Sequence, residues 1–310
     1  MSNSINSDEI LKDVLLSAIK EQKLKRRWGI FFKLSFLVVT IFFLFAIFGS
    51  STRMIKNTGN YAALVDINGI ISNNSQSNAD DIVTGLDNAF KDPGTKGIIL
   101  RINSPGGSPV QASEIYNEIL RQRHLYPNIK VYAVCTDICT SAAYYIASAT
   151  NQVYANPASL VGSIGVLIDG FGFVGSLQKL GIERRLLTAG KHKGFLDPFS
   201  PLSNEDVKFV DTMLDSIHER FIKDVLRGRG NRLKINADTF SGYAWTGEEA
   251  LPQGLIDGYG SAGEVARNII KTDNIEDFTV KPNPVDLFVQ KVGASFAVHF
   301  MSALKAWQVS

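Results

Sequence analysis

The chain has 310 residues, which is enough for one large domain or two domains of medium size. Its 32 basic and 30 acidic residues leave a formal net charge of +2, so the composition offers no strongly basic surface and argues against nucleic acid as a partner. The two cysteines and four scattered histidines do not supply the about four ligands of a zinc site, and we expect neither a metal nor another cofactor.

The first feature in chain order is an apolar stretch near the N-terminus. Residues 28–48 are almost wholly apolar, with Lys33 as their single charged residue. A helix of that length rises about 30 Å, which is the thickness of the hydrocarbon core of a bilayer. Basic residues crowd the N-terminal side of the stretch, and few follow it. The positive-inside rule therefore predicts a cytoplasmic leader at 1–27, a transmembrane anchor at 28–49 and a linker at 50–60.

A cleaved secretory signal is the alternative interpretation of this stretch. The apolar run and the leader before it are both long for a signal peptide, and no convincing small-x-small cleavage site follows. We therefore expect a permanent single-span anchor, with the N-terminus in the cytoplasm and the rest of the chain across the membrane.

From Tyr61 onwards, strand-like and helix-like patterns alternate. The predicted strands are short apolar runs, and the predicted helices are longer segments with capping signals or one apolar face. We expect strands at 62–67, 97–103, 131–134, 152–155 and 165–168, and helices at 82–91, 109–123, 141–147, 204–227 and 263–270. This alternation predicts an α/β domain at 61–272, with a largely parallel sheet and right-handed crossovers.

A glycine pair follows the strand expected at 97–103. Because glycines let a backbone approach a ligand with its N–H groups exposed, Gly106 and Gly107 are candidates for an oxyanion hole. Next, Ser108 can cap a helix, and Gln111 would complete a capping box. A plain turn is the alternative for the glycine pair, and no Gly-Lys-Ser/Thr follows it, as a phosphate-binding loop would require.

Two segments carry candidate catalytic side chains. Ser141 lies at a predicted strand-to-helix corner, where backbone N–H groups and the positive end of a helix dipole lie close by. Lys191, His192 and Lys193 lie in a loop bracketed by glycines. A serine nucleophile needs a base, which a desolvated lysine or a histidine can supply. The pattern does not separate these three residues, and a helix cap and solvated side chains are the plain alternatives.

Two further segments allow two interpretations each. Cys135 and Cys139 can be small buried thiols, which we favour, or a strained local disulfide in an oxidising compartment. The C-terminal segment at 273–310 carries an amphipathic stretch. We expect this stretch to be an oligomer-contact or docking helix, with a membrane-surface helix as the alternative.

Five segments carry motifs in a fixed order: 103–107 with the glycine pair, 136–147 with Ser141, 155–166, 190–199 with Lys193, and 244–257. In that order they resemble the motifs of the signal peptide peptidase A family of membrane-anchored serine proteases, in its short, single-repeat bacterial form. The resemblance covers about residues 61–270.

The resemblance implies the Clp protease/crotonase-like fold and a role for each matching residue. Ser141 would be the nucleophile, Lys193 the general base, and Ser163 a hydroxyl that positions the lysine amine. The Gly107 N–H would be an oxyanion donor, with Gly106 in the same oxyanion loop. In this family the serine and the lysine of one site come from neighbouring subunits of a ring, so a homo-oligomer is implied, and we expect an octamer.

The function implied is that of an endopeptidase at the bacterial inner membrane, with its protease domain periplasmic, that degrades remnant signal peptides and other hydrophobic peptides. A crotonase-like acyl-CoA enzyme and a catalytically silent membrane scaffold are the rival interpretations of the same fold. The sequence departs from the family pattern in two places: Ala142 and Ala143 stand where the family has two glycines, and Tyr243 stands where arginine is common.

Overall fold

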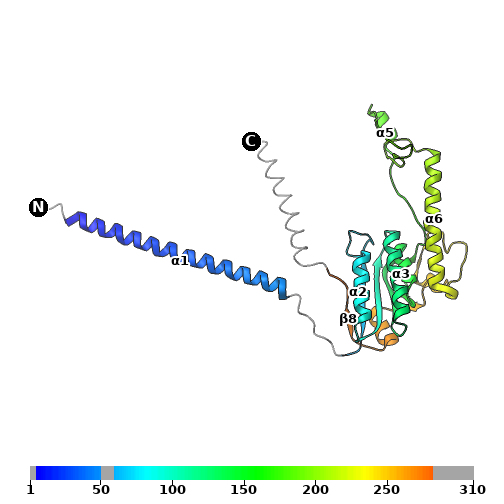
Figure 1. Ribbon diagram of the computed structural model, residues 1–310, viewed down its shortest axis with the longest axis horizontal. Helices are drawn as coiled ribbons and strands as arrows, with labels where there is room; N and C mark the ends of the chain where they lie inside the picture. The colour runs from blue at the N-terminus through cyan, green and yellow to red at the C-terminus, as the bar shows by residue number, and fades with distance from the viewer. Residues whose placement is uncertain (1–4, 50–58, 282–310) are drawn as a thin grey trace. The chain divides into compact units, whose positions relative to one another are not determined.

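The computed structural model describes residues 5–49 and 59–281, which include nearly all of the predicted domain (Figure 1). The described residues belong to two units. One of them contains the helix α1 (Ile5–Gly49), and the other contains all remaining elements. Most of the predicted oligomer-contact segment, residues 282–310, lies outside the described residues.

Helix α1 runs without a break through the predicted leader and the predicted anchor. A membrane span needs about 20 predominantly apolar residues in one helix. Among the described residues, no helix combines that length with sufficient apolar character. The transmembrane anchor predicted at 28–49 is therefore not supported by the structure.

The second unit alternates strands and helices, as the sequence pattern predicted. The strands are β1 (Tyr61–Asn68), β2 (Thr95–Ser104), β3 (Lys130–Thr140), β4 (Gln152–Ala155), β5 (Leu160–Gly162), β6 (Ala244–Thr246), β7 (Gly258–Tyr259) and β8 (Ile275–Asp277). The helices are α2 (Ala79–Lys91), α3 (Pro109–Leu125), α4 (Ala142–Ser148), α5 (Val174–Lys179), α6 (Asn204–Arg229), α7 (Gly247–Ala250) and α8 (Ala262–Glu264), with the 3₁₀ turn η2 (Gly230–Arg232) and the π-helical turn η3 (Val265–Ile270).

Within residues 59–281, the strands form a single eight-stranded sheet. Its main order is β6-β5-β3-β2-β1-β8, and β4 pairs with β3 and with β7. Every strand pair is parallel except β5 with β6. The predicted largely parallel α/β sheet is therefore confirmed. Strand β8 joins β1 at the sheet edge, so the sheet includes residues up to Asp277.

The side chains of each central strand alternate between two hydrophobic clusters. Along β1, Ala63 and Val65 belong to the larger cluster, which includes residues of α2, α3 and α4. Ala62 and Leu64 point to the smaller cluster, which includes the first residues of η3. Figure 1 shows α2 and α3 side by side against the sheet. Both faces of the central strands are thus buried, as expected for a parallel sheet.

Two local predictions need correction. The predicted capping box at the start of α3 is incomplete: Ser108 caps the helix, but the Gln111 side chain accepts a hydrogen bond from the Ala79 N–H at the start of α2 (2.7 Å). The strand predicted at 165–168 does not form, and the strand in this region is β5, at Leu160–Gly162. Leu167 is 78% exposed, so this apolar run has no sheet neighbour among the described residues.

The two cysteines are free and buried in the larger cluster. They lie on β3, on either side of an irregularity in its pairing with β2. Burial, followed by a hydrogen bond with Cys135, raises the pKa of the Cys139 thiol well above its usual value. A buried neutral thiol is unreactive, so the structure favours the first interpretation of this pair.

A buried ion pair fastens the end of α6 to the sheet. The Arg229 side chain is 0% exposed, and its guanidinium donates to both carboxylate oxygens of Asp257 (2.7 and 3.0 Å). It also donates to the Gly254 carbonyl (2.7 and 3.0 Å). Asp257 in turn accepts the Val153 N–H in β4 (2.7 Å). This network holds the C-terminal end of α6 against β4.

Replacing Asp257 by asparagine should lower the free energy of unfolding by about 3 kcal/mol, because the buried Arg229 guanidinium loses its counter-charge. Chemical denaturation of the full chain measures the loss. Glu183→Gln is the matched control, because Glu183 pairs with Arg185 on the surface (2.9 Å) and both side chains are mostly exposed. An equally small effect for both substitutions would contradict the stabilising role of the buried pair.

Candidate active site

Ser141 occupies the predicted corner between β3 and α4. Its backbone has φ 54° and ψ −125°, a left-handed conformation that costs a residue with a side chain about 1–3 kcal/mol. The Ser141 N–H donates to the Gly162 carbonyl in β5 (2.8 Å), and the Ser141 carbonyl accepts from Tyr145 in α4 (3.0 Å). Its hydroxyl makes no capping bond to the helix. A strained serine with a free hydroxyl at a strand-to-helix corner is suited to nucleophilic attack.

The glycine pair lies directly against this serine. Gly106 has φ +107°, and a Cβ there would lie 2.7 Å from the Ser141 Cβ. Gly107 has φ +147°, and a Cβ there would lie 2.1 Å from the Ile71 carbonyl oxygen. Two hydrogen bonds hold the loop. The Ile71 N–H donates to the Gly106 carbonyl (2.9 Å), and the Ser108 N–H donates to the Ile71 carbonyl (2.8 Å). A side chain at either position would collide with neighbouring atoms, so both positions require glycine.

Two backbone N–H groups near Ser141 are available to a ligand. The Gly107 N–H makes no hydrogen bond among the described residues. The Ala142 N–H belongs to the first residue of α4, where helical N–H groups have no partner within the helix. The Ala142 nitrogen is also 3.0 Å from the position of a Cβ on Gly106. This pair has the chemistry of an oxyanion hole.

Ser163 is brought to the same place, because it follows the Gly162 whose carbonyl holds the Ser141 N–H. Ser163 also has a positive φ, 51°. Its N–H donates to the Tyr243 carbonyl (2.8 Å), and its hydroxyl donates to the Gly242 carbonyl (3.0 Å). Two of the four non-glycine residues with positive φ in the described residues thus meet at this corner. Such concentrated backbone strain is typical of functional sites.

The three candidate bases of the lysine loop differ in their partners. Lys191 pairs with Glu205 (2.9 Å), and His192 lies beside Asp206 (3.3 Å) and Glu205 (3.5 Å). The ammonium group of Lys193 has no hydrogen-bond or ion-pair partner within the described residues. Lys193 is therefore the one residue of the three that is free to act on another group.

Within one chain, Lys193 is not brought to Ser141. The ring of Phe195, next to the lysine, contacts Phe209 near the start of α6 (5.9 Å between centroids). Farther along α6, Phe221 stacks on Tyr145, which belongs to the same helix as the serine corner (4.7 Å). Phe209 and Phe221 are twelve residues apart, so about 18 Å of helix separates the two contacts. No hydrogen bond joins the candidate base to the candidate nucleophile within the described part of the chain.

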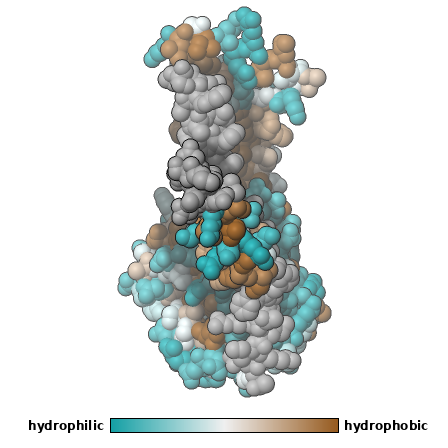
Figure 2. Space-filling view, turned by 90° about the vertical axis from the view of Figure 1, so that its left-hand side faces the viewer, coloured by the Kyte–Doolittle hydropathy of each residue, from teal (hydrophilic) through white to brown (hydrophobic). Residues whose placement is uncertain are grey.

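The segment that carries Lys193 forms an arm, which we define as residues 165–203. Figure 1 shows its helix α5 beyond the N-terminal end of α6, away from the sheet. Figure 2 shows hydrophobic residues on the surface in the upper part of the view, where this arm lies. Its exposed apolar side chains are Leu167, Ile168, Phe171, Phe173, Leu180, Ile182, Leu186, Leu187, Phe195, Leu196, Phe199 and Leu202. An exposed apolar surface of this extent is typical of a protein–protein contact.

A polar network that no sequence motif indicated joins α4 to α6. The Tyr145 hydroxyl and the Arg220 guanidinium both donate to the Asp224 carboxylate, and the Tyr116 hydroxyl donates to the Asp224 carbonyl (2.7 Å). Asp224 lies on the buried stripe of α6 beside Phe221. The sequence signal for this network is an aspartate at a position of α6 where the helical periodicity predicts an apolar, buried residue.

None of these groups forms a metal site. Across residues 5–49 and 59–281, no three histidine, cysteine, aspartate or glutamate side chains gather closely enough to hold a metal ion. The groups gathered at the Ser141 corner are a hydroxyl and backbone N–H groups, and the amine of Lys193 lies apart from them in the same chain.

The mostly parallel α/β domain fits the Clp-protease-like fold. Residues 124–276 match the model of "Peptidase family S49". The predicted resemblance to the signal peptide peptidase A family is therefore confirmed.

Three relatives illustrate the match. A "Putative signal peptide peptidase SppA" of Enterococcus faecium is 28% identical over 70% of this chain and 64% of its own length. A putative protease of Methanocaldococcus jannaschii is 29% identical over 62% of this chain and 61% of its own length. A protein of Brucella abortus named "Na(+)/H(+) antiporter NhaA" is 43% identical over 56% of this chain, but the match spans only 24% of that protein. The chain thus spans less than two thirds of each of these relatives.

Proposed function

We propose that the protein is a serine endopeptidase with a Ser/Lys dyad. The observation that carries this proposal is the strained Ser141 corner, which lies against Gly106, while the next residue, Gly107, has an N–H without a hydrogen-bond partner among the described residues. The family match favours a peptidase over the crotonase-like acyl-CoA enzyme. The strained backbone at Ser141 and Ser163 favours an enzyme over a catalytically silent scaffold, because such strain is typical of functional sites.

The proposed reaction begins when the Ser141 hydroxyl oxygen attacks the scissile carbonyl carbon, while its proton passes to the uncharged amine of Lys193. The negative charge that develops on the carbonyl oxygen is stabilised by the N–H groups of Gly107 and Ala142. As the C–N bond breaks, the lysine ammonium returns the proton to the leaving amine, and an acyl-enzyme ester remains. Water then hydrolyses the ester with the same lysine as base. Ser163 would orient the amine through its hydroxyl.

Labelling with a serine-reactive phosphonate tests this assignment. The wild-type protein should become covalently modified at Ser141, and Ser141→Ala should not, since the phosphonate reacts with an activated hydroxyl. Mass spectrometry of the intact chain measures the added mass. A wild-type protein that stays unmodified, with its fold intact, would favour the scaffold interpretation.

We propose further that the lysine of each site comes from a neighbouring copy of the chain. Lys193 is exposed on the apolar arm, and about 18 Å of helix separates its loop from the region of Ser141 in its own chain. A closed ring of identical subunits would let each arm reach the next serine, and the family resemblance suggests eight subunits. Association would also bury the arm's apolar side chains, which are costly to leave in water.

Replacing Leu187 by aspartate should dissociate the oligomer and abolish peptidase activity. Leu187 is 96% exposed in the single chain, so a charge there should leave the folded subunit stable while opposing an apolar contact. Size-exclusion chromatography with light scattering measures the oligomer. Ile235→Asp is the matched control, because Ile235 is exposed but lies outside the arm. If the Leu187 variant assembles like the control, the arm does not form the contact.

The substrates that we propose are remnant signal peptides and other hydrophobic peptides. The location that we propose is the bacterial inner membrane, with the first 27 residues cytoplasmic and the protease domain periplasmic. This location is supported by the basic residues that precede the apolar stretch at 28–48 and by the family resemblance. Fractionation of cells expressing the full chain tests the location, and recovery only in the cytoplasmic fraction would exclude it.

A further inference from the structure

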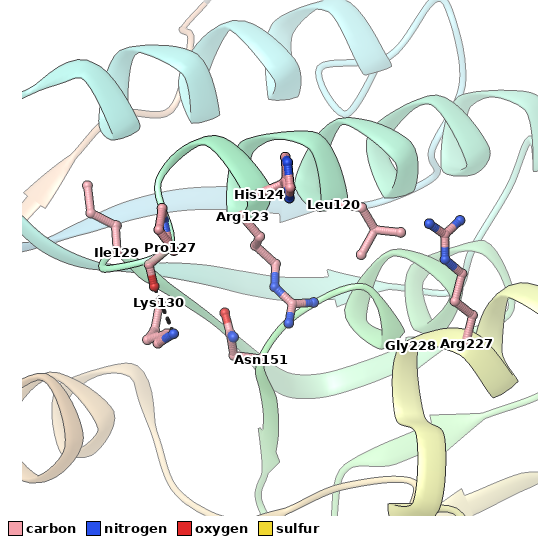
Figure 3. A pocket seen from close by; sticks show the side chains of 9 residues that line it. All are labelled: Leu120, Arg123, His124, Pro127, Ile129, Lys130, Asn151, Arg227 and Gly228. Atoms are coloured by element: carbon pink, nitrogen blue, oxygen red, sulfur yellow. Dashed lines mark hydrogen bonds between the residues drawn. The ribbon is translucent and has the colours of Figure 1, made fainter.

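A cavity of about 480 Å³ lies at the opposite end of β3 from the serine corner. It lies between the C-terminal ends of α3 and α6 (Figure 3). The lining residues are Leu120, Arg123, His124, Pro127, Ile129, Lys130, Asn151, Arg227 and Gly228. Lys130 begins β3 and Thr140 ends it, so about 30 Å separates this cavity from the Ser141 corner. The cavity is therefore independent of the candidate active site.

Positive charge without a counter-charge lines the cavity. Arg123, Lys130 and Arg227 come from α3, β3 and α6, and no aspartate or glutamate is among the lining residues. Across the described part of the chain, none of the three forms an ion pair. The nearby Arg232, by contrast, lies 3.4 Å from Asp257. Three uncompensated cations around a depression produce a local potential that attracts anions.

Arg123 retains hydrogen-bonding capacity that the protein does not use. Its Nη1 donates to the Ala149 carbonyl at the end of α4, which is an ordinary role for a basic side chain at a helix C-terminus. Its Nε is buried and has no partner within the described residues. Burial, followed by the charge of Arg232, lowers the pKa of Arg123. A buried N–H without an acceptor is costly, so an acceptor supplied by a ligand would stabilise this corner.

The other lining residues suit the organic part of a ligand that carries an anionic group. Leu120, Pro127 and Ile129 form an apolar wall, and the cavity volume lies in the range of small-molecule sites. Guanidinium groups match the geometry of phosphate oxygens, and an ammonium adds a third charge. We propose that this cavity binds the phosphate group of an organic phosphate.

The phosphate could belong to a soluble molecule or to the headgroup of an anionic phospholipid. The first residue of β1 lies at the same edge of the sheet as the cavity, because β1, β2 and β3 run parallel and all begin there. The shared chemistry is the phosphate, and the test separates its two sources.

Titration of the full chain with inorganic phosphate, followed by isothermal calorimetry, tests the site. We expect saturable binding, which the double substitution K130Q/R227Q weakens by about tenfold or more through the loss of charge-assisted hydrogen bonds. Both side chains are exposed, so the fold should persist, and an unchanged melting temperature confirms this. K208Q/R267Q is the matched control, because these two exposed residues carry the same two charges outside the cavity.

Vesicle co-sedimentation then separates the two sources of phosphate. If K130Q/R227Q reduces binding to vesicles that contain phosphatidylglycerol, but not to phosphatidylcholine vesicles, the ligand is a lipid headgroup. If it reduces only the binding of inorganic phosphate, the ligand is soluble. The proposal is overturned if the wild type shows no saturable phosphate binding up to about 10 mM, or if the folded double variant binds phosphate as the control does.

Discussion

Replacing Ser141 by alanine should reduce the hydrolysis of a hydrophobic fluorogenic peptide by about a thousandfold or more, because the attacking oxygen is lost. Alanine keeps the Cβ of serine, so the backbone strain at φ 54° and the contact with Gly106 remain. The substitution therefore removes the hydroxyl without relaxing the corner. The oligomer and the melting temperature should be unchanged, which separates a loss of chemistry from a loss of structure.

Lys193→Ala should cause a loss of similar size, and the two inactive variants should complement each other. When their subunits are exchanged in equal amounts, about one quarter of the sites should combine an intact serine with an intact neighbouring lysine. Recovery of activity on mixing measures this. A mixture of Lys193→Ala with the double variant lacking both groups is the matched control and should stay inactive. If the first mixture also stays inactive after subunit exchange, the dyad does not form between chains.

The neighbours of Lys193 provide a check on the identity of the base. Lys191 and His192 are engaged with Glu205 and Asp206, so their replacement by alanine should loosen the attachment of the loop to α6 without removing the proton acceptor. These variants should retain most of the wild-type kcat. A loss with His192→Ala and full activity with Lys193→Ala would reverse the assignment.

Much of the fold could be predicted because its signals are local. Apolar runs of strand length and helix caps such as Ser108 depend on neighbouring residues, and the structure confirms them. The strand predicted at 165–168 failed for a non-local reason. Its apolar residues have the composition of a strand, but a strand also needs a partner, and Leu167 in the arm meets none within the described chain. A sequence pattern does not show whether such an apolar run packs against its own chain or against another chain.

In the candidate site, too, the features that depend on neighbouring residues were predictable, and those that depend on tertiary contacts were not. The sequence placed Ser141 at a corner and the glycine pair after a strand, because both depend on short-range chain geometry. It did not separate Lys193 from its neighbours, because the distinction depends on Glu205 and Asp206 at the start of α6. Nor did it indicate that Asp224 joins α6 to the serine helix through Tyr145. These contacts form only after the chain has folded.

The glycine at position 107 should be nearly as sensitive as the serine. Gly107→Ala places a Cβ 2.1 Å from the Ile71 carbonyl oxygen, at a φ of +147°. The loop must shift to relieve that contact, and its N–H then leaves the position from which it would stabilise the oxyanion. Loss of one such donor costs about 100- to 1000-fold in kcat. We therefore expect a loss of this size, with KM changed little.

Gly69→Ala is the matched control for this substitution. Gly69 also has a positive φ, +75°, but a Cβ there meets no atom within 4 Å. Alanine at this position imposes the backbone strain without the collision, so a modest loss of stability with nearly normal kcat is expected. Steady-state kinetics and thermal melts of both variants give the comparison. Equal kcat values for the two variants would show that the Gly107 loop does not supply an oxyanion donor, because only the Gly107 substitution displaces that N–H.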